Sequence, residues 1–169
     1  MSRQPVPFVD VIETLYRETE ANGVLLTSAG ADGSANVMTI GWGLYGRSYR
    51  GSPTVAVAVR PACHTFGLLD EVGEFVIAVP TQDMVELVTY CGTASGRSGD
   101  KFAKTGLSPI DSFDVAPVSI EECPFNIECR IYHKERPPHW ILTPEHRENP
   151  VEEQHTIYFA EVLGAYAAE

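Results

Sequence analysis

The longest β-type run in this chain is TIYFAEVLGAYA, residues 156–167. Apolar and other residues alternate along much of it, which is typical of a strand with one face in a core. A second run, over residues 125–134, alternates around the letters NIECRIYH. Four shorter β-type runs precede it, at residues 24–28, 35–40, 54–59 and 74–79. Residues 29–33, AGADG, have turn chemistry and predict a hairpin between the first two. Together these runs predict a mainly β fold.

Helical spacing is found in four shorter segments, at residues 8–19, 65–72, 82–90 and 100–104. These segments do not alternate regularly with the β-type runs, so we expect an antiparallel sheet rather than parallel βαβ units. The glycine-rich residues 41–53 predict an irregular loop, and residues 140–142 form a short apolar stretch. We find no internal repeat and no linker, so residues 1–169 are expected to form a single domain.

The chain has 169 residues, of which 44% are hydrophobic, and its net charge is −11 with histidine neutral. This composition is ordinary for a globular protein, and the negative charge argues against nucleic acid or an anionic membrane as a partner. Most basic side chains precede residue 110, so an anionic ligand is expected to bind there. The chain has neither the ~18-residue apolar run of a membrane span nor a signal-peptide pattern. We therefore expect a cytoplasmic protein.

One pattern has the spacing of a known motif but not its context, and the cysteines and histidines lack the spacing of a metal site. Gly41-x-Gly43-x-x-Gly46 fits the dinucleotide-binding fingerprint, but the residues that follow, RSYRGSP at 47–53, cannot begin the helix that this motif needs. The four cysteines contain no C-x2-C pair, and no two histidines lie four apart on an expected helix. We therefore expect no metal site, and inert, buried thiols.

The segment CGTASGRSGDKF, residues 91–102, has the ingredients of a phosphate-binding loop. Its glycines let backbone N–H groups approach an anion, its hydroxyls can donate hydrogen bonds, and Arg97 and Lys101 add positive charge. It contains no G-K-[ST], so it is not the loop of a nucleoside-triphosphate-binding protein. A flexible surface loop is the alternative interpretation.

The segment NVMTIGW, residues 36–42, combines polar and apolar side chains on an expected strand. The amide of Asn36 and the hydroxyl of Thr39 suit the edge of a heteroaromatic ring, while Met38 and Trp42 suit its faces. Ordinary core packing is the alternative interpretation.

Taken in order, five segments resemble the flavin reductase-like family, whose members bind FMN on a split β-barrel. They are Asn36-x-Met38-Thr39-x-x-Trp42, Arg60-x-x-x-His64-Thr65, Gly73-Glu74-Phe75-Val76 with Pro80, Cys91-Gly92-x-x-Ser95-Gly96-Arg97-x-x-Asp100-Lys101-Phe102, and His155-Thr156-Ile157-x-Phe159-x-Glu161-Val162. The chain is most similar to the flavoredoxin-type branch of that family. The resemblance implies an antiparallel split β-barrel with a few short helices, in one FMN-binding domain.

The resemblance also implies roles for the matching residues. Four would lie along the isoalloxazine and ribityl groups: Asn36, Met38, Thr39 and Trp42. Six would contact the phosphate or the ribityl chain: Arg60, Thr65, Ser95, Gly96, Arg97 and Lys101. His155 would reach the cofactor from the start of the last long strand. No catalytic side chain is implied, because nicotinamide and flavin carry out hydride transfer themselves.

The chain departs from the family pattern at two places. Cys63-His64 stands where the family often has a basic residue followed by an aromatic one, which leaves the number of charges at the phosphate open. Ala160 replaces the usual glycine before Glu161-Val162. Both departures are compatible with the family.

Three functions remain open at this point. The first is an FMN-dependent oxidoreductase that takes electrons from NADH or NADPH and passes them to free flavin or another acceptor. The second is an electron-carrier flavoprotein reduced by a redox protein partner, with the acidic C-terminal third as docking surface. The third is a binding module that has lost flavin, and the nearly complete set of matching residues argues against it.

The resemblance further implies a homodimer with FMN near the subunit interface. Four aromatic residues beside expected loops are candidate interface anchors: Tyr45, Tyr49, Tyr90 and Trp140.

Overall fold

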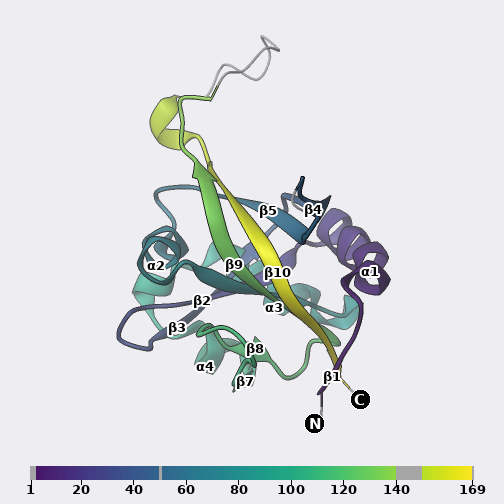
Figure 1. Ribbon diagram of the computed structural model, residues 1–169. Coiled ribbons are helices and arrows are strands. Elements are labelled where there is room, and N and C mark those ends of the chain that lie inside the picture. Colours follow the sequence, from purple (N-terminus) through teal and green to yellow (C-terminus); the bar gives the residue numbers. More distant parts are fainter. Residues whose placement is uncertain (1–2, 50, 140–149, 169) are drawn as a thin grey trace.

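The computed structural model describes residues 3–49, 51–139 and 150–168 (Figure 1). Its strands are β1 (Arg3–Pro5), β2 (Val24–Ala29), β3 (Ala35–Ile40), β4 (Gly43–Arg47), β5 (Pro53–Val59), β6 (Glu74–Val79), β7 (Pro109–Ile110), β8 (Ser119–Ile120), β9 (Phe125–Glu135) and β10 (Thr156–Ala168). Its α-helices are α1 (Phe8–Ala21), α2 (His64–Val72), α3 (Val85–Thr93) and α4 (Lys101–Thr105). Short 3₁₀ helices are η1 (Gln82–Met84), η2 (Gly96–Ser98) and η4 (Val151–Glu153). None of these helices is long and apolar enough to span a bilayer.

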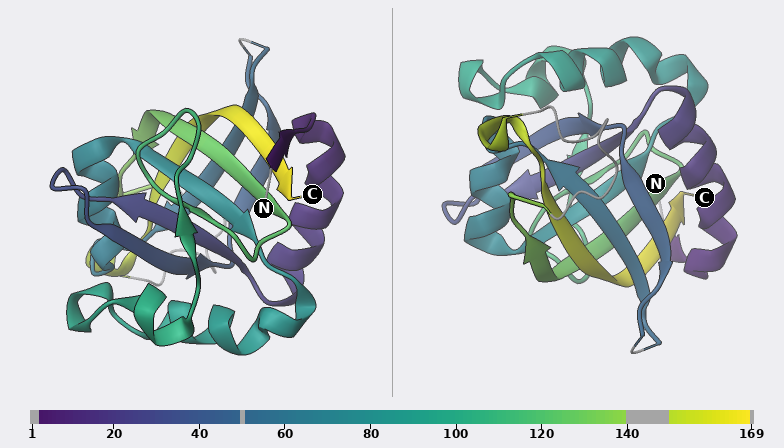
Figure 2. Two further views of the ribbon diagram at one scale, coloured as in Figure 1. Left: turned by 90° about the horizontal axis from the view of Figure 1, so that it is seen from below. Right: turned by 90° about the horizontal axis from the view of Figure 1, so that it is seen from above.

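Eight strands form one antiparallel sheet in the order β3-β2-β6-β9-β10-β5-β4, with β1 alongside β10. The sheet rolls around a core, as the two views of Figure 2 show, and the described residues of β3 and β4 at its two ends do not pair. The barrel is therefore split rather than closed, and no described strand pairs with the outer edge of β3. The expected mainly β, antiparallel architecture is confirmed.

The core inside the barrel is closed at one side by α1. Phe8, Val11 and Leu15 lie on one face of this helix and are buried among the inward side chains of the strands. Their spacing of three and four residues brings them to one face of a 3.6-residue helix. The helix expected over residues 8–19 is thus confirmed, and it runs to Ala21.

Strand β2 is buried along its whole length because both of its faces are covered. Val24 and Leu26 point into the barrel core, whereas Leu25 packs outside against a second cluster with Val88 and Phe102. That second cluster belongs to the layer of α3 and α4, which lies along the β2–β3 hairpin in Figure 2. Strand β3, at the edge of the barrel sheet, is therefore covered on its outer face by α3 and α4.

Two sequence expectations need correction. Residues 41–53 are not all irregular, because Gly43–Arg47 forms β4 and pairs with β5. Its glycines give the segment no strand-like side-chain pattern, but backbone pairing needs no particular side chain. Tyr45 anchors the strand, because its ring packs on the core and its hydroxyl lies 2.8 Å from Thr19 Oγ1. Helix α3 also continues to Thr93, so the first residues of the segment 91–102 are helical rather than loop. The apolar stretch at residues 140–142 lies outside the described residues.

Candidate functional site

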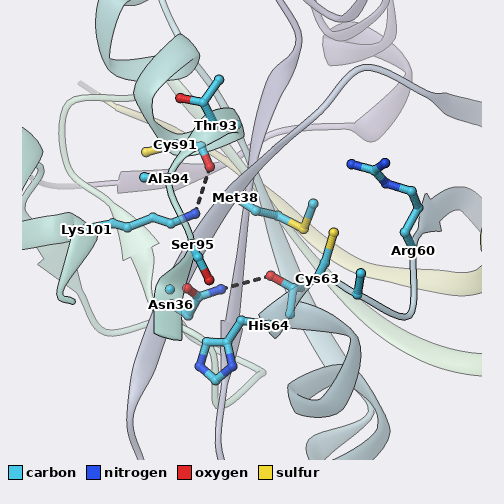
Figure 3. A pocket seen from close by; sticks show the side chains of 14 residues that line it. Asn36, Met38, Arg60, Cys63, His64, Cys91, Thr93, Ala94, Ser95 and Lys101 are labelled. Carbon is cyan, nitrogen blue, oxygen red and sulfur yellow. Dashed lines mark hydrogen bonds between the residues drawn. The ribbon is translucent and has the colours of Figure 1, made fainter. Parts of the chain in front are cut away.

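A cavity of about 190 Å³ lies at the outer edge of β3, where α2 begins and α3 ends (Figure 3). Five parts of the chain meet there: β3, the turn after β5, the first turn of α2, the end of α3 with the turn that follows it, and α4. The lining residues are Asn36, Met38, Arg60, Ala62, Cys63, His64, Thr65, Cys91, Gly92, Thr93, Ala94, Ser95, Gly96 and Lys101.

A buried hydrogen bond fixes the floor of this cavity. Asn36 Nδ2 on β3 donates to Thr65 Oγ1 in the first turn of α2 at 2.9 Å, and the two residues are only 6% and 2% exposed. Asn36 Nδ2 also lies 3.5 Å from Ser28 Oγ of the neighbouring strand β2. Because a buried amide must be hydrogen-bonded, this pair sets how closely α2 approaches β3.

Lys101 places a positive charge inside the cavity. It is 6% exposed, and its Nζ donates to the Cys91 carbonyl oxygen at 2.8 Å. No carboxylate among the described residues pairs with it. Burial lowers the pKa of this ammonium, and the nearby Cys91 and Cys63 thiols oppose that shift in part. An ammonium has three N–H donors, so Lys101 can bind an anion and keep its bond to Cys91.

The charge around the cavity is of one sign. The basic residues Arg60, His64 and Lys101 all line it, whereas none of its described lining residues is acidic. In a chain with 23 Asp and Glu side chains and a net charge of −11, this local excess of cations is suited to an anionic ligand.

Two glycines allow the backbone to come close to the wall of the cavity. A Cβ added at Gly96 would overlap the side-chain oxygen of Asn36 and lie 2.7 Å from His64 Cδ2. A Cβ at Gly92 would lie 3.2 Å from Thr39 Cβ. The last turn of α3 can therefore approach β3, and the segment after it can approach β3 and α2, because these positions carry no side chain.

The structure brings seven of the eleven residues expected at the site into the cavity wall. These are Asn36, Met38, Arg60, Thr65, Ser95, Gly96 and Lys101. The other four, Thr39, Trp42, Arg97 and His155, do not line it.

Each of those four has a different position. The Thr39 hydroxyl donates to the Val88 carbonyl on α3, on the opposite face of β3. The guanidinium of Arg97 donates to the Ala62 carbonyl at 2.8 Å and ties η2 to the turn before α2. Trp42 follows β3 and is 42% exposed. His155 is largely exposed; the partial burial of its ring, followed by the charge of the nearby Arg60, lowers its pKa.

Sequence reasoning assigned no role to several lining residues, among them Cys63 and His64. Cys63 and His64 were recognised as a departure from the family pattern, which was the available signal. Thr93 lies in the last turn of α3, and the longer helix is what brings it to the cavity.

The comparisons with known proteins agree with this architecture. Residues 17–169 match the family described as Flavin reductase like domain. The flavoredoxin of Desulfovibrio vulgaris (Miyazaki F) superposes with a TM-score of 0.71 and 26% identity, covering 87% of this chain and 69% of that one. An FMN-binding domain of a flavin reductases-like enzyme from Shewanella baltica gives 0.69 and 22%, covering 98% and 77%. The latter supports the fold alone, and with it the split barrel is confirmed.

A curated relative extends the similarity in sequence. It is an uncharacterized protein of Archaeoglobus fulgidus, 40% identical over 97 residues, which are 57% of this chain and 53% of that protein. The match thus spans about half the length of that relative.

Proposed function

Because this chain belongs to the flavin reductase-like domain family, we propose that it is an FMN-binding oxidoreductase, which passes electrons from NADH or NADPH through bound FMN to free flavin or another acceptor. The observation that carries the proposal is the cavity at the edge of β3, which gathers Arg60 and Lys101 and has no acidic residue in its described wall. FMN carries a phosphate with close to two negative charges, so it matches this excess of cations.

The residues present fit the separate parts of FMN. Lys101 and Arg60 would hold the phosphate, together with the hydroxyls of Ser95 and Thr65 and the backbone at Gly96. Asn36 would hydrogen-bond the polar edge of the ring system, and Met38, a flexible apolar side chain, would lie against its surface. These seven residues are the part of the expected set that lines the cavity.

The remaining four expected residues would act less directly. Thr39 and Arg97 would support the cavity by tying β3 to α3 and η2 to the turn at Ala62. Trp42 and His155 would flank the open side, where a nicotinamide or another acceptor approaches. FMN, when bound, would supply the chemistry of hydride and electron transfer, so this chain's residues would have to bind and orient the two partners rather than supply a catalytic acid or base.

The proposal is tested with the purified protein. We expect a flavin absorbance spectrum, either as purified or after incubation with FMN, and acid-released cofactor that elutes as FMN in chromatography. Anaerobic titration with NADH and NADPH is then expected to bleach that spectrum. A protein that takes up no flavin would overturn the binding proposal itself.

A second candidate function rests on the similarity to flavoredoxin. In that case a redox protein, and not a nicotinamide, would reduce the bound FMN. The same titration distinguishes the two functions: a flavin-loaded protein that dithionite reduces, but neither NADH nor NADPH reduces, would be an electron carrier.

We further propose a homodimer, as the family resemblance implies. The cytoplasmic location expected from the sequence likewise stays a prediction.

A further inference from the structure

A second cavity, of about 310 Å³, lies between the end of the β4–β5 hairpin and the strands β9 and β10. It shares no lining residue with the first cavity. The lining residues are Ser48, Tyr49, Ser52, Thr54, Tyr132 and Glu161. A carboxylate, two phenol rings and three hydroxyls thus surround one space, and no described lining residue is basic.

The carboxylate of Glu161 has no partner within the described part of the chain. In the sheet Glu161 lies opposite Arg130 of β9 and Thr54 of β5. Arg130 would be its natural cross-strand partner, but the guanidinium is engaged elsewhere. Its Nε donates to Glu74 Oε1 at 2.9 Å, and it also contacts the Asp114 carbonyl at 3.4 Å.

An irregularity in the β9–β10 pairing supplies one of the two rings. Phe159 pairs with His133 and Ala160 with Ile131, so Tyr132 has no partner residue on β10. Such a β-bulge redirects the side chain of the extra residue. Here the redirected side chain is the Tyr132 ring, which is 55% exposed and lines the cavity.

The second ring comes from the hairpin. Tyr49 is 91% exposed and lines the cavity. Arg47 of the same hairpin does not line the cavity, and its Nε donates to the Gly51 carbonyl at 2.8 Å.

We propose that this second cavity binds an organic cation, an alkylammonium or guanidinium group. Aromatic ring faces attract such cations, and a carboxylate neutralises their charge. The cation would lie beside Glu161, with its alkyl groups against Tyr49 and Tyr132. The net charge of −11 favours a cation over an anion at an exposed site.

The test uses choline and its neutral isostere 3,3-dimethylbutan-1-ol, with ethylguanidinium as a second cation. We expect both cations to bind in the millimolar range by titration calorimetry, and the neutral isostere to bind about fivefold more weakly or not at all. Glu161→Gln and Tyr132→Leu are each expected to weaken choline binding about threefold or more.

Matched controls are Glu86→Gln on α3 and Tyr16→Leu on α1, which exchange exposed side chains of the same types outside the cavity. Both are expected to bind choline like the wild type. An unchanged urea midpoint for Glu161→Gln and Tyr132→Leu would show that the variants remain folded.

The cation could also be a Lys or Arg side chain of a second copy of this chain. In that case choline binds the wild type poorly, and Glu161→Gln or excess choline shifts the mass in sedimentation equilibrium toward the monomer. The proposal is wrong if the cations bind no better than the isostere and Glu161→Gln leaves both choline binding and mass unchanged.

Discussion

Lys101 and Lys104 lie on the same short helix, but only Lys101 is buried and lines the first cavity. We predict that Lys101→Met weakens FMN binding roughly tenfold or more, because a charge-assisted hydrogen bond contributes about 1.5–3 kcal/mol. Methionine keeps the apolar stem, so the loss reports the charge. Flavin fluorescence titration measures the effect.

Two controls make this prediction specific. Lys104→Met is expected to bind FMN like the wild type, because Lys104 is exposed. Riboflavin, which lacks the phosphate, is expected to bind Lys101→Met and wild type equally. Equal FMN affinity of Lys101→Met and wild type would remove Lys101 from the phosphate site.

Thr39 provides a second test at the residue scale, because its hydroxyl bonds the Val88 carbonyl of α3 rather than facing the cavity. We predict that Thr39→Val lowers the free energy of unfolding by about 1 kcal/mol, and changes the FMN dissociation constant by less than about twofold. Urea denaturation and FMN titration measure the two quantities. A large loss of FMN affinity at unchanged stability would instead make Thr39 a direct cofactor contact.

At the scale of elements, helix α2 contains a glycine that its geometry does not require. A Cβ added at Gly67 meets no atom within 4 Å, and the residue lies in the interior of the helix. We predict that Gly67→Ala raises the free energy of unfolding by about 0.5–1 kcal/mol.

Gly73 ends the same helix in the left-handed conformation, with a φ of 73°. Gly73→Ala is therefore expected to lower the free energy of unfolding by about 1–2 kcal/mol. Urea denaturation measures both variants, and a change of the same sign in Gly67→Ala and Gly73→Ala would contradict this account of α2.

A buried carboxylate on strand β9, that of Glu128, binds the backbone of Phe113 and Asp114 in the segment before β8. Glu128 is 0% exposed and accepts hydrogen bonds from the backbone N–H groups of Phe113, at 2.9 Å, and Asp114, at 2.6 Å. Burial raises the pKa of Glu128, the two N–H groups oppose that shift, the Asp114 charge adds to it, and Arg3 opposes it. The net direction is upward.

A raised pKa means that the folded protein holds this proton more tightly than the unfolded chain does. The stability contributed by Glu128 is then fully present below its usual pKa, and is lost as pH rises through the raised pKa. We predict that the unfolding free energy of wild type minus that of Glu128→Gln falls with rising pH over this window. Urea titrations between about pH 4 and 8 measure it. A difference that rises with pH would contradict the assigned direction.

At the scale of the whole molecule, the proposed homodimer predicts a light-scattering mass twice that of the chain at micromolar concentration. The candidate anchors differ in the structure: Tyr49 and Tyr90 are 91% and 39% exposed, whereas Tyr45 packs on the barrel core. Trp140 lies outside the described residues. Tyr90→Ser is therefore expected to weaken association more than Tyr45→Phe does. A monomer that still binds FMN would refute a site shared between subunits.

The sequence by itself determined the class of fold and the segments that build the site. Period-two runs predicted β2, β3, β5, β6, β9 and β10, and helical spacing predicted α1 and α2, because both signals are local consequences of which face is buried. The glycine-rich segment at 91–102 and the segment at 36–42 were identified as ligand-binding candidates, and both supply residues to the cavity.

Only the tertiary structure decided which side chains of those segments enter the cavity. Asn36 and Thr39 lie on opposite faces of β3, and the face that stays open depends on α3 covering the other. Arg97 and Lys101 are equally plausible cations in the sequence, yet Arg97 is bound to the distant Ala62 carbonyl and Lys101 is buried. Strand β4 was missed because its evidence is its pairing with β5, and not a side-chain pattern. In each case the deciding contact joins two different elements or segments, and the local periodicity of one segment carries no information about such contacts.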